Sequence, residues 1–416
     1  MKKISLAKIL KAISAAIDLV SNTVVSHHKK VTYLTYKIAK EMNVAEQDLK
    51  NLVMAALIHD IGVFYISGVD LHDYSFDDPD NAHALIGYYL LNESALLQGI
   101  SPIIKYHHVA WNKFPDDIPD IYSILCLADQ VGFLSEKYDI YYESGEIARI
   151  VEEASGTLFW PEAVDAFLSL LSKEYFALDL KSSAAINREL DNAILQYKDL
   201  VDVDKILDIS KVVSYIIDFR SPFTVTHSIG VGRVAREMAR LTGFSGEEQQ
   251  LMEIAAYFHD IGKLTVAPEI LNKPGKLTRD EWRVMRAHSY YTYQVLSHID
   301  DLPELKEWAA YHHEKLDGTG YPFQLKADEL STGARIMAVA DIFTAITEDR
   351  PYRKGMNKKQ VIEILTEQVE DNKLDRDIVA VLLDNYDHIN RLRMKSQLMS
   401  MNDYQDFRLV ALSQSG

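Results

Sequence analysis

The chain of 416 residues contains a single cysteine, Cys126, which lies in an apolar stretch. One cysteine excludes an intramolecular disulfide framework and any zinc or iron–sulfur site built from several cysteines. A lone thiol fits a reducing compartment, so we expect a cytoplasmic protein.

Positive charge is also scarce, since 44 Lys and Arg face 61 Asp and Glu for a formal net charge of −17. Duplex nucleic acids are bound by a cationic face that releases counterions, so coating of DNA or RNA is disfavoured. Charges beyond about 8 Å are largely screened at physiological salt, so a few local cations can still bind an anionic small molecule.

Long hydrophobic runs are missing as well. No window approaches the ~18 uninterrupted apolar residues of a membrane span. Lys8, Lys11 and Asp18 interrupt the apolar N-terminal segment. We interpret that segment as an amphipathic helix and not as a signal peptide.

Helical periodicity dominates the rest of the chain. Apolar residues recur at i, i+3 and i+4 over long stretches, whereas alternating β-branched runs bounded by turns are scarce. The pattern predicts an all-α fold.

An internal repeat organises this helical chain. Three segments of the first half return after 200, 205 and 212 residues: HDIG at 59–62 and 259–262, HH at 107–108 and 312–313, and AD at 128–129 and 340–341. We therefore predict two tandem domains of one fold, at 1–177 and 206–416, joined by a helical connector at 178–205.

Histidines and carboxylates recur in both copies. In the second copy the set is His227, His259, Asp260, His288, His312, His313 and Asp341. These side chains are ligands of Zn, Mn or Fe, and a set larger than four usually holds more than one ion. Asp260 is the candidate bridge between two ions; the alternative is a hydrogen-bonded polar core inherited by both copies.

Two ions roughly 3.5–4 Å apart would provide a bridging hydroxide near neutral pH and orient its attack on a phosphoester. No protein nucleophile motif is evident. If the helix before His259 continues, Lys263 shares its metal-facing side. Arg350 and Arg353 are candidates to clamp phosphate oxygens.

A turn follows the second His-His pair. The composition of DGTGYP at 317–322 is typical of a turn, because glycine permits positive φ and proline fixes φ. The sequence leaves two roles open for Tyr321: ordinary packing, or a platform on which a base stacks.

These motifs resemble the HD-GYP family of bacterial cyclic-dinucleotide phosphodiesterases, a branch of the HD metal-dependent phosphohydrolases. The resemblance spans about 203–354, and its segments are HDIGK (259–263), ILNKPGKL (270–277), HHE (312–314), DGTGYP (317–322) and RPYRK (350–354).

The resemblance implies a tandem of two HD-type domains. It implies metal ligation by the seven residues, catalysis involving Asp260 and Lys263, and phosphate contacts from Lys263, Arg350 and Arg353. With Tyr321 as the stacking platform, these residues are our candidate substrate contacts. The implied reaction is hydrolysis of cyclic di-GMP or 3′,3′-cyclic GMP-AMP to a linear dinucleotide. Two divalent ions are implied, with Fe or Mn favoured and Ni or Zn left open.

Three positions depart from the family pattern. Phe223 stands where some members carry an acidic residue that supports a third metal, so we expect two metals. Thr292 replaces a common glycine, and Thr344 replaces a frequent second aspartate. These departures weaken any transfer of substrate preference.

The first copy keeps His27, His59, Asp60, His83, His107, His108 and Asp129. It has Val63 in place of the lysine and lacks the Gly-Tyr-Pro loop and both arginines. We predict a degenerate HD domain with a regulatory or structural role; the alternative is hydrolysis of a smaller nucleotide. Tandem pairs of this kind are similar to HD-GYP proteins assigned to cyclic GMP-AMP.

Two other functions stay open from the sequence: a non-catalytic cyclic-dinucleotide receptor, and a general HD 5′-nucleotidase. A homodimer is compatible with the sequence, which gives no sign of the oligomeric state.

Overall fold

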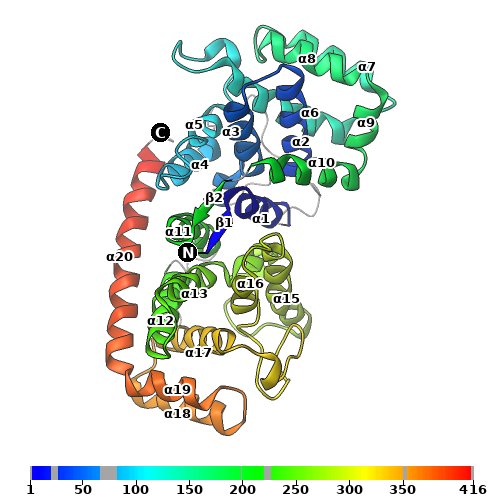
Figure 1. Ribbon diagram of the computed structural model, residues 1–416. Coiled ribbons are helices and arrows are strands. Elements are labelled where there is room, and N and C mark those ends of the chain that lie inside the picture. Colours follow the sequence, from blue (N-terminus) through cyan, green and yellow to red (C-terminus); the bar gives the residue numbers. More distant parts are fainter. Residues whose placement is uncertain are drawn as a thin grey trace. The chain divides into compact units, whose positions relative to one another are not determined.

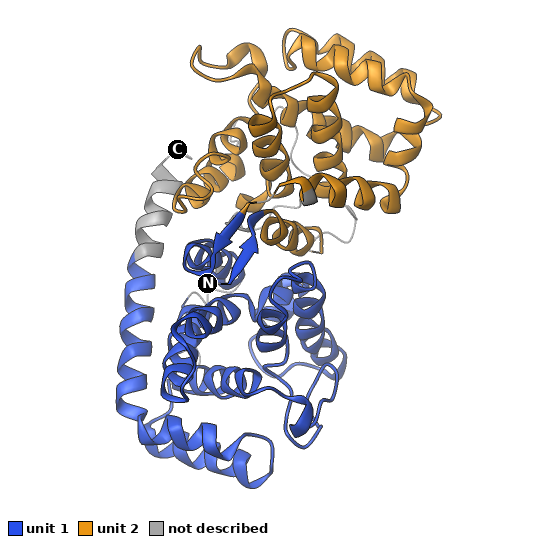
Figure 2. Ribbon diagram, viewed as in Figure 1, with its two compact units in different colours: residues 1–6, 200–414, 416 blue, residues 7–199, 415 orange. Residues whose placement is uncertain are grey.

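The computed structural model describes residues 2–19, 27–65, 82–197, 199–219, 226–349 and 354–413. They form two compact units built almost entirely of helices (Figure 1 and Figure 2). Unit 1 comprises residues 1–6, 200–414 and 416, and unit 2 comprises residues 7–199 and 415. The predicted all-α class is confirmed.

Unit 2 carries the first copy of the repeat. Its helices are α1 (Leu6–Asp18), α2 (His27–Glu41), α3 (Glu46–Leu57), η1 (Ile61–Tyr65), α4 (Ala82–Asn92), α5 (Ser101–Tyr106), η2 (Trp111–Lys113), η3 (Asp120–Tyr122), α6 (Ser123–Lys137), α7 (Ser144–Glu153), α8 (Pro161–Leu171), α9 (Glu174–Leu180) and α10 (Ser183–Gln196), where η marks a 3₁₀ helix. In α1, Ile9, Ile13 and Ile17 are buried, as the amphipathic pattern predicts.

Unit 1 carries the second copy. Its elements are β1 (Lys3–Ser5), β2 (Leu200–Asp202), α11 (Val203–Phe219), α12 (His227–Leu241), α13 (Gly246–Phe258), η4 (Ile261–Thr265), α14 (Pro268–Leu271), α15 (Arg279–Leu296), α16 (Pro303–Ala310), η5 (Ala327–Glu329), α17 (Thr332–Thr347), α18 (Lys358–Glu370), α19 (Arg376–Asp384) and α20 (Tyr386–Ser413). Among the described residues, no helix combines the length and the apolar character that crossing a bilayer requires.

Residues 178–205, where we predict a connector, divide between the two units. Ala193 and Tyr197, in and just after α10, are buried against Tyr36 of α2 and Val53 of α3, within unit 2. The boundary between the units falls after Asp199. The following strand, β2, pairs antiparallel with β1 of unit 1.

Helix α13 leads the chain into the centre of unit 1. A capping box starts the helix: the Ser245 side chain accepts from the Glu248 amide, and the Glu248 carboxylate accepts from the Ser245 amide. Such a cap satisfies amide groups that a helix start leaves unpaired. Every residue of 251–258 is buried. The helix therefore delivers the next two residues, His259 and Asp260, into the core.

The 3₁₀ turn η4 then passes very close to α15. A Cβ added to Gly262 would lie 1.9 Å from the carbonyl oxygen of His288 and 2.8 Å from the amide nitrogen of Thr292. Both obstructing atoms belong to backbone, so no side-chain rotation relieves the overlap. Glycine at this position allows η4 and α15 to touch.

We expect Gly262→Ala to lower the free energy of unfolding by about 1–3 kcal/mol, the usual cost of overpacking a core. The matched control is Gly246→Ala, since a Cβ there meets nothing within 4 Å. The control should be neutral or stabilise the chain by up to about 1 kcal/mol. Urea unfolding followed by circular dichroism measures both, and equal stabilities of the two variants would contradict the packing constraint.

Candidate functional site

The structure brings together all seven residues of the second-copy set. They come from five places in unit 1: His227 begins α12, His259 and Asp260 follow α13, His288 lies in α15, His312 and His313 follow α16, and Asp341 lies in α17. His313 is partly exposed, and the other six are buried.

The seven residues form two groups around one carboxylate. In the first group, the ligand atoms of His227, His259 and Asp341 lie within 4.8 Å of one another. Within it, His227 Nε2 is 3.2 Å from Asp341 Oδ1. Three donor atoms this close together could hold a metal ion.

The second group consists of His288, His312 and His313, whose ligand nitrogens also lie within 4.8 Å of one another. The Nε2 atoms of His288 and His312 are 3.3 Å apart.

The Asp260 carboxylate lies between the two groups. Its Oδ2 is 3.2 Å from His259 Nε2, and its Oδ1 is 3.4 Å from His288 Nε2. One oxygen therefore faces each group, as a carboxylate that bridges two ions must do.

The same hydrogen bond orients three of the imidazoles. In each, Nδ1 donates to the backbone carbonyl three residues earlier: His259 to Ala256 at 2.6 Å, His288 to Met285 at 2.7 Å, and His312 to Ala309 at 2.7 Å. A carbonyl only accepts, so the proton of each neutral ring resides on Nδ1. The Nε2 lone pairs are left to face the centre.

The chemistry of these donors fits a pair of divalent transition metals. His259 Nε2 and Asp260 Oδ1 are buried and make no hydrogen bond. Burial lowers the pKa of His288 to about 4, and burial together with His288 lowers that of His313 to about 3. These rings are neutral near pH 7, which is the form that binds metal.

Lys263 contacts the Asp260 carboxylate, but not from a continued α-helix as we expected. The α-helix before His259 does not continue; it ends at Phe258, and Lys263 projects from η4. Its ammonium pairs with Asp260 Oδ2. Burial opposes the charge, but Asp260 raises the pKa of Lys263 above its ordinary value. Lys263 is therefore positively charged near pH 7.

Glu314 holds the loop 317–322 against the end of α16. Its carboxylate accepts hydrogen bonds from the amides of Phe323 at 2.7 Å and Leu325 at 3.0 Å. A Cβ on Gly320 would lie 2.5 Å from the Glu314 Cα. The glycine and the glutamate of the motif thus work together, one allowing the close approach and the other securing it.

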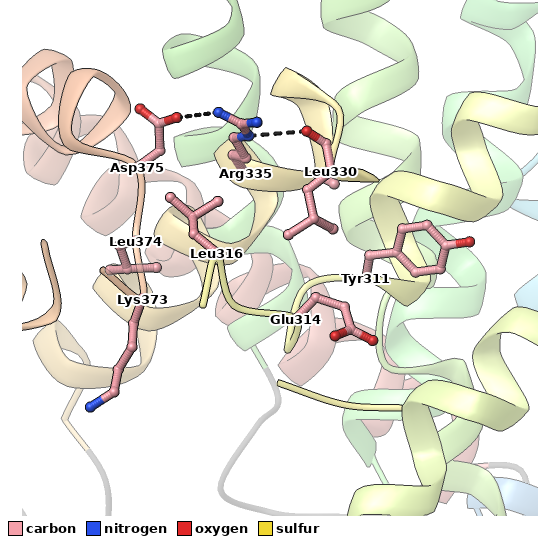
Figure 3. Close-up of a pocket in the computed structure, with 10 residues that line it drawn as sticks. Tyr311, Glu314, Leu316, Leu330, Arg335, Lys373, Leu374 and Asp375 are labelled. Carbon is pink, nitrogen blue, oxygen red and sulfur yellow. Dashed lines mark hydrogen bonds and ion pairs between the residues drawn. The ribbon is translucent and has the colours of Figure 1, made fainter. Parts of the chain in front are cut away.

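Arg335 of α17 anchors the segment that follows this loop. It donates to the carbonyl of Leu330 at 3.0 Å and pairs with Asp375 at 2.6 Å. Figure 3 shows these contacts around a small cavity that Glu314 and Tyr311 also line.

Tyr321 lies at the second group, held by this loop. Its ring is 4.8 Å from the His313 ring, with 34° between their planes. The guanidinium carbon of Arg286 lies 4.5 Å from the Tyr321 ring centre. An aromatic ring and a cation therefore flank the ligand set. Arg350, Arg353 and Phe223, singled out from the sequence, lie outside the described residues.

Two residues at the site escaped the sequence analysis. Arg286 precedes His288 by two positions, a spacing that places side chains on different faces of a helix, so the pattern carries no signal for it. Glu348 accepts from His227 Nδ1 at 3.2 Å. It follows Asp341 by seven residues, which is two helical turns, and that spacing was a usable signal.

Of the two described departures from the family pattern, Thr292 makes hydrogen bonds at the site. Thr292 Oγ1 donates to the His259 carbonyl at 3.0 Å and accepts from the Gly262 amide at 3.1 Å. The hydroxyl therefore adds hydrogen bonds where η4 meets α15. Thr344 is buried, with its methyl 3.0 Å from the position of a Cβ on Gly230.

Models of the HD domain match residues 24–133 and 211–378. The chain is 30% identical over 407 residues to the 3′3′-cGAMP-specific phosphodiesterase 1 of Vibrio cholerae, with 92% of each chain covered. It is 38% identical over 146 residues to a cyclic di-GMP phosphodiesterase of Pseudomonas aeruginosa, with 35% of each chain covered.

A crystal structure of a cyclic GMP-AMP-specific phosphodiesterase from Vibrio cholerae shares the fold, with a TM-score of 0.66 and 22% identity. The match covers 92% of this chain and 98% of the other. Both copies of the repeat are thus HD domains, and the relative aligned over nearly the whole chain is a phosphodiesterase. The chain belongs to the HD-GYP family of cyclic-dinucleotide phosphodiesterases.

Proposed function

We propose that the second copy hydrolyses one 3′–5′ phosphodiester of 3′,3′-cyclic GMP-AMP and releases the linear dinucleotide. The observation that carries the proposal is the Asp260 carboxylate, which presents one oxygen to each of two three-residue ligand groups. The choice of cyclic GMP-AMP over cyclic di-GMP rests on the relative of that specificity, which aligns over 92% of this chain.

We assign the two ions to the seven residues. His227, His259 and Asp341 would hold one ion, His288, His312 and His313 the other, and Asp260 both. Ions bound there would supply Lewis acidity toward phosphate oxygens and a nucleophile near neutral pH. Imidazole and carboxylate donors suit Fe or Mn, which we favour.

The chain's own cations would then hold the substrate. The Lys263 ammonium, fixed on Asp260 beside the ligand groups, faces the charge that grows on phosphate during in-line attack. Arg286 and Tyr321 lie together at the second group, where a guanidinium and an aromatic ring suit a second phosphate and a base. Arg350 and Arg353 are assigned to phosphate binding from the family motif alone.

We place this activity in the cytoplasm. Cys126, the one cysteine, is a free buried thiol, which is compatible with a reducing compartment.

The decisive experiment incubates metal-replete protein with cyclic GMP-AMP, cyclic di-GMP, cyclic di-AMP and 5′-mononucleotides, and separates the products by chromatography. We expect a linear dinucleotide from cyclic GMP-AMP. The Asp260→Asn protein should be slower by more than about 100-fold, because loss of a bridging ligand exceeds the usual effect of an outer-shell change. Binding of the dinucleotide without turnover would favour a receptor, and faster release of phosphate from 5′-mononucleotides would favour a nucleotidase.

Lys263→Met should lower kcat for the cyclic dinucleotide by about 100-fold, the usual loss when one donor to developing charge is removed. Metal content, measured on the same protein by elemental analysis, should stay near the wild-type value. Lys359→Met, on the exposed face of α18, is the control. Unchanged kcat in Lys263→Met would remove this lysine from the mechanism.

Arg286→Ala should raise KM for the cyclic dinucleotide by about tenfold, equivalent to ~1.4 kcal/mol of lost binding. Its effect on kcat should be smaller, because Arg286 would contact a part of the substrate that is distant from the reacting phosphate. Arg283→Ala is the matched control: it lies one turn away on α15, exposed and paired with Asp280. A KM that is equal in the two variants would argue against the assignment of Arg286.

A further inference from the structure

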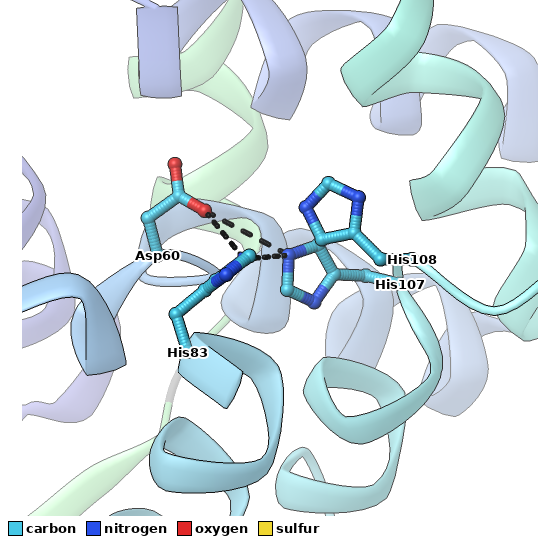
Figure 4. A group of neighbouring side chains, drawn as sticks. All are labelled: Asp60, His83, His107 and His108. Atoms are coloured by element: carbon cyan, nitrogen blue, oxygen red, sulfur yellow. Dashed lines mark hydrogen bonds and ion pairs between the residues drawn. The ribbon is translucent and has the colours of Figure 1, made fainter. Parts of the chain in front are cut away.

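The first copy assembles a second complete set of metal-ligand side chains. His27, His59 and Asp129 form one group of mutually close donors, and Asp60, His83, His107 and His108 form another. Asp60 again lies between the groups. Its Oδ2 is 3.3 Å from His59 Nε2, and its Oδ1 is 3.6 Å from His83 Nε2. Figure 4 shows the Asp60 carboxylate facing the rings of His83 and His107.

The rings of this set are oriented as in the second copy. His59 Nδ1 donates to the Ala56 carbonyl at 3.0 Å, and His107 Nδ1 donates to the Ile104 carbonyl at 2.6 Å. His59 is fully buried, and its Nε2 makes no hydrogen bond. Burying so many polar groups without a cation is costly. A divalent ion at the centre would offset that cost.

The two copies differ in the cation that contacts the central carboxylate. The turn after Asp60 matches the turn after Asp260: the Val63 amide donates to the Asp60 carbonyl at 2.9 Å, and the Lys263 amide donates to the Asp260 carbonyl at 2.8 Å. Val63 therefore occupies the position of Lys263 but brings no ammonium to Oδ2.

His28 fills this place from another helix. Its Nε2 lies 3.4 Å from Asp60 Oδ2, and its Nδ1 bonds to Asp18 Oδ1 at 2.8 Å. The second copy has Ser228 at the matching position, which bonds to Asp218, the counterpart of Asp18. The change from lysine to valine in η1 is thus accompanied by a change from serine to histidine in α2, and the central carboxylate keeps a nitrogen partner.

We propose that the first copy holds its own pair of divalent first-row transition metal ions, with Asp60 bridging and His28, supported by Asp18, positioning the bridge. His27, His59 and Asp129 ligate one ion, and His83, His107 and His108 ligate the other. Imidazole and carboxylate donors select Fe, Mn, Ni or Zn over Mg or Ca. The first copy is degenerate in its phosphate-binding lysine and loop but not in its metal centre. This inference does not depend on what the second copy hydrolyses.

The test is a count of metal ions in the full-length protein. Wild-type, Asp60→Ala, Asp260→Ala and double-variant proteins are loaded with Fe(II) or Mn(II), desalted and measured by elemental analysis. We expect about four ions per chain in the wild type, about two in each single variant and none in the double variant. An Asp60→Ala protein with wild-type metal content, or an Asp260→Ala protein with none, would overturn the proposal.

Folding is controlled within the same series. Glu93→Gln changes an exposed carboxylate of the first copy and should keep the full metal content. Circular dichroism reports the helical content of each protein. If Asp60→Ala loses helix, the isosteric Asp60→Asn and the His83→Ala proteins provide the count.

The role of His28 is tested in the Asp260→Ala background, where only first-copy ions remain. His28→Ser should weaken metal binding, measured by competition with a chelator, by about 10–100-fold, the usual effect of an outer-shell change. Adding Val63→Lys recreates the second-copy arrangement and should restore most of the affinity. Equal affinity with and without His28 would overturn its positioning role, and failure of Val63→Lys to rescue would show that the two side chains are not equivalent.

Discussion

One hydrogen bond, repeated at His259, His288 and His312, determines the geometry of the second-copy site. Each ring gives its Nδ1 proton to a carbonyl three residues back along its own segment. The bond fixes the tautomer and the ring plane, so Nε2 always faces the centre. The Ala256 and Ala309 carbonyls lie in the last turns of α13 and α16, where carbonyls lack partners within the helix, whereas the Met285 carbonyl lies inside α15. The helical fold thus orients these three candidate ligands.

The tandem sequence contained most of this site. The two copies keep the same histidines and aspartates, which distinguished the candidate ligands from ordinary polar residues, and the structure places all seven of the second copy together. Local geometry was harder to predict. The α-helix ends before His259, so Lys263 reaches Asp260 from a 3₁₀ turn. Arg286 could not be found at all, since its contact with Tyr321 joins α15 to a loop 35 residues away.

A close backbone approach explains why both copies have a glycine two residues after the central aspartate. Gly62 and Gly262 each leave room for the carbonyl of a histidine on the next helix, His83 and His288 respectively. A second backbone amide lies at each contact, and it belongs to Gly87 in the first copy and to Thr292 in the second. A hydroxyl that bonds across the contact therefore stabilises only the second copy. Both copies therefore keep the glycine that the close approach requires, while the residue that faces it on the next helix differs.

The pairing of Lys3–Ser5 with Leu200–Asp202 makes the whole first copy an insertion between two strands of unit 1. During synthesis, β1 leaves the ribosome almost 200 residues before its partner strand exists. The first copy can complete its own core in that interval, whereas β1 must wait unpaired. Because Ser5 and Leu200 lie opposite each other, the ends of the inserted copy are held side by side. Adjacent termini are the property that lets one domain be inserted into another.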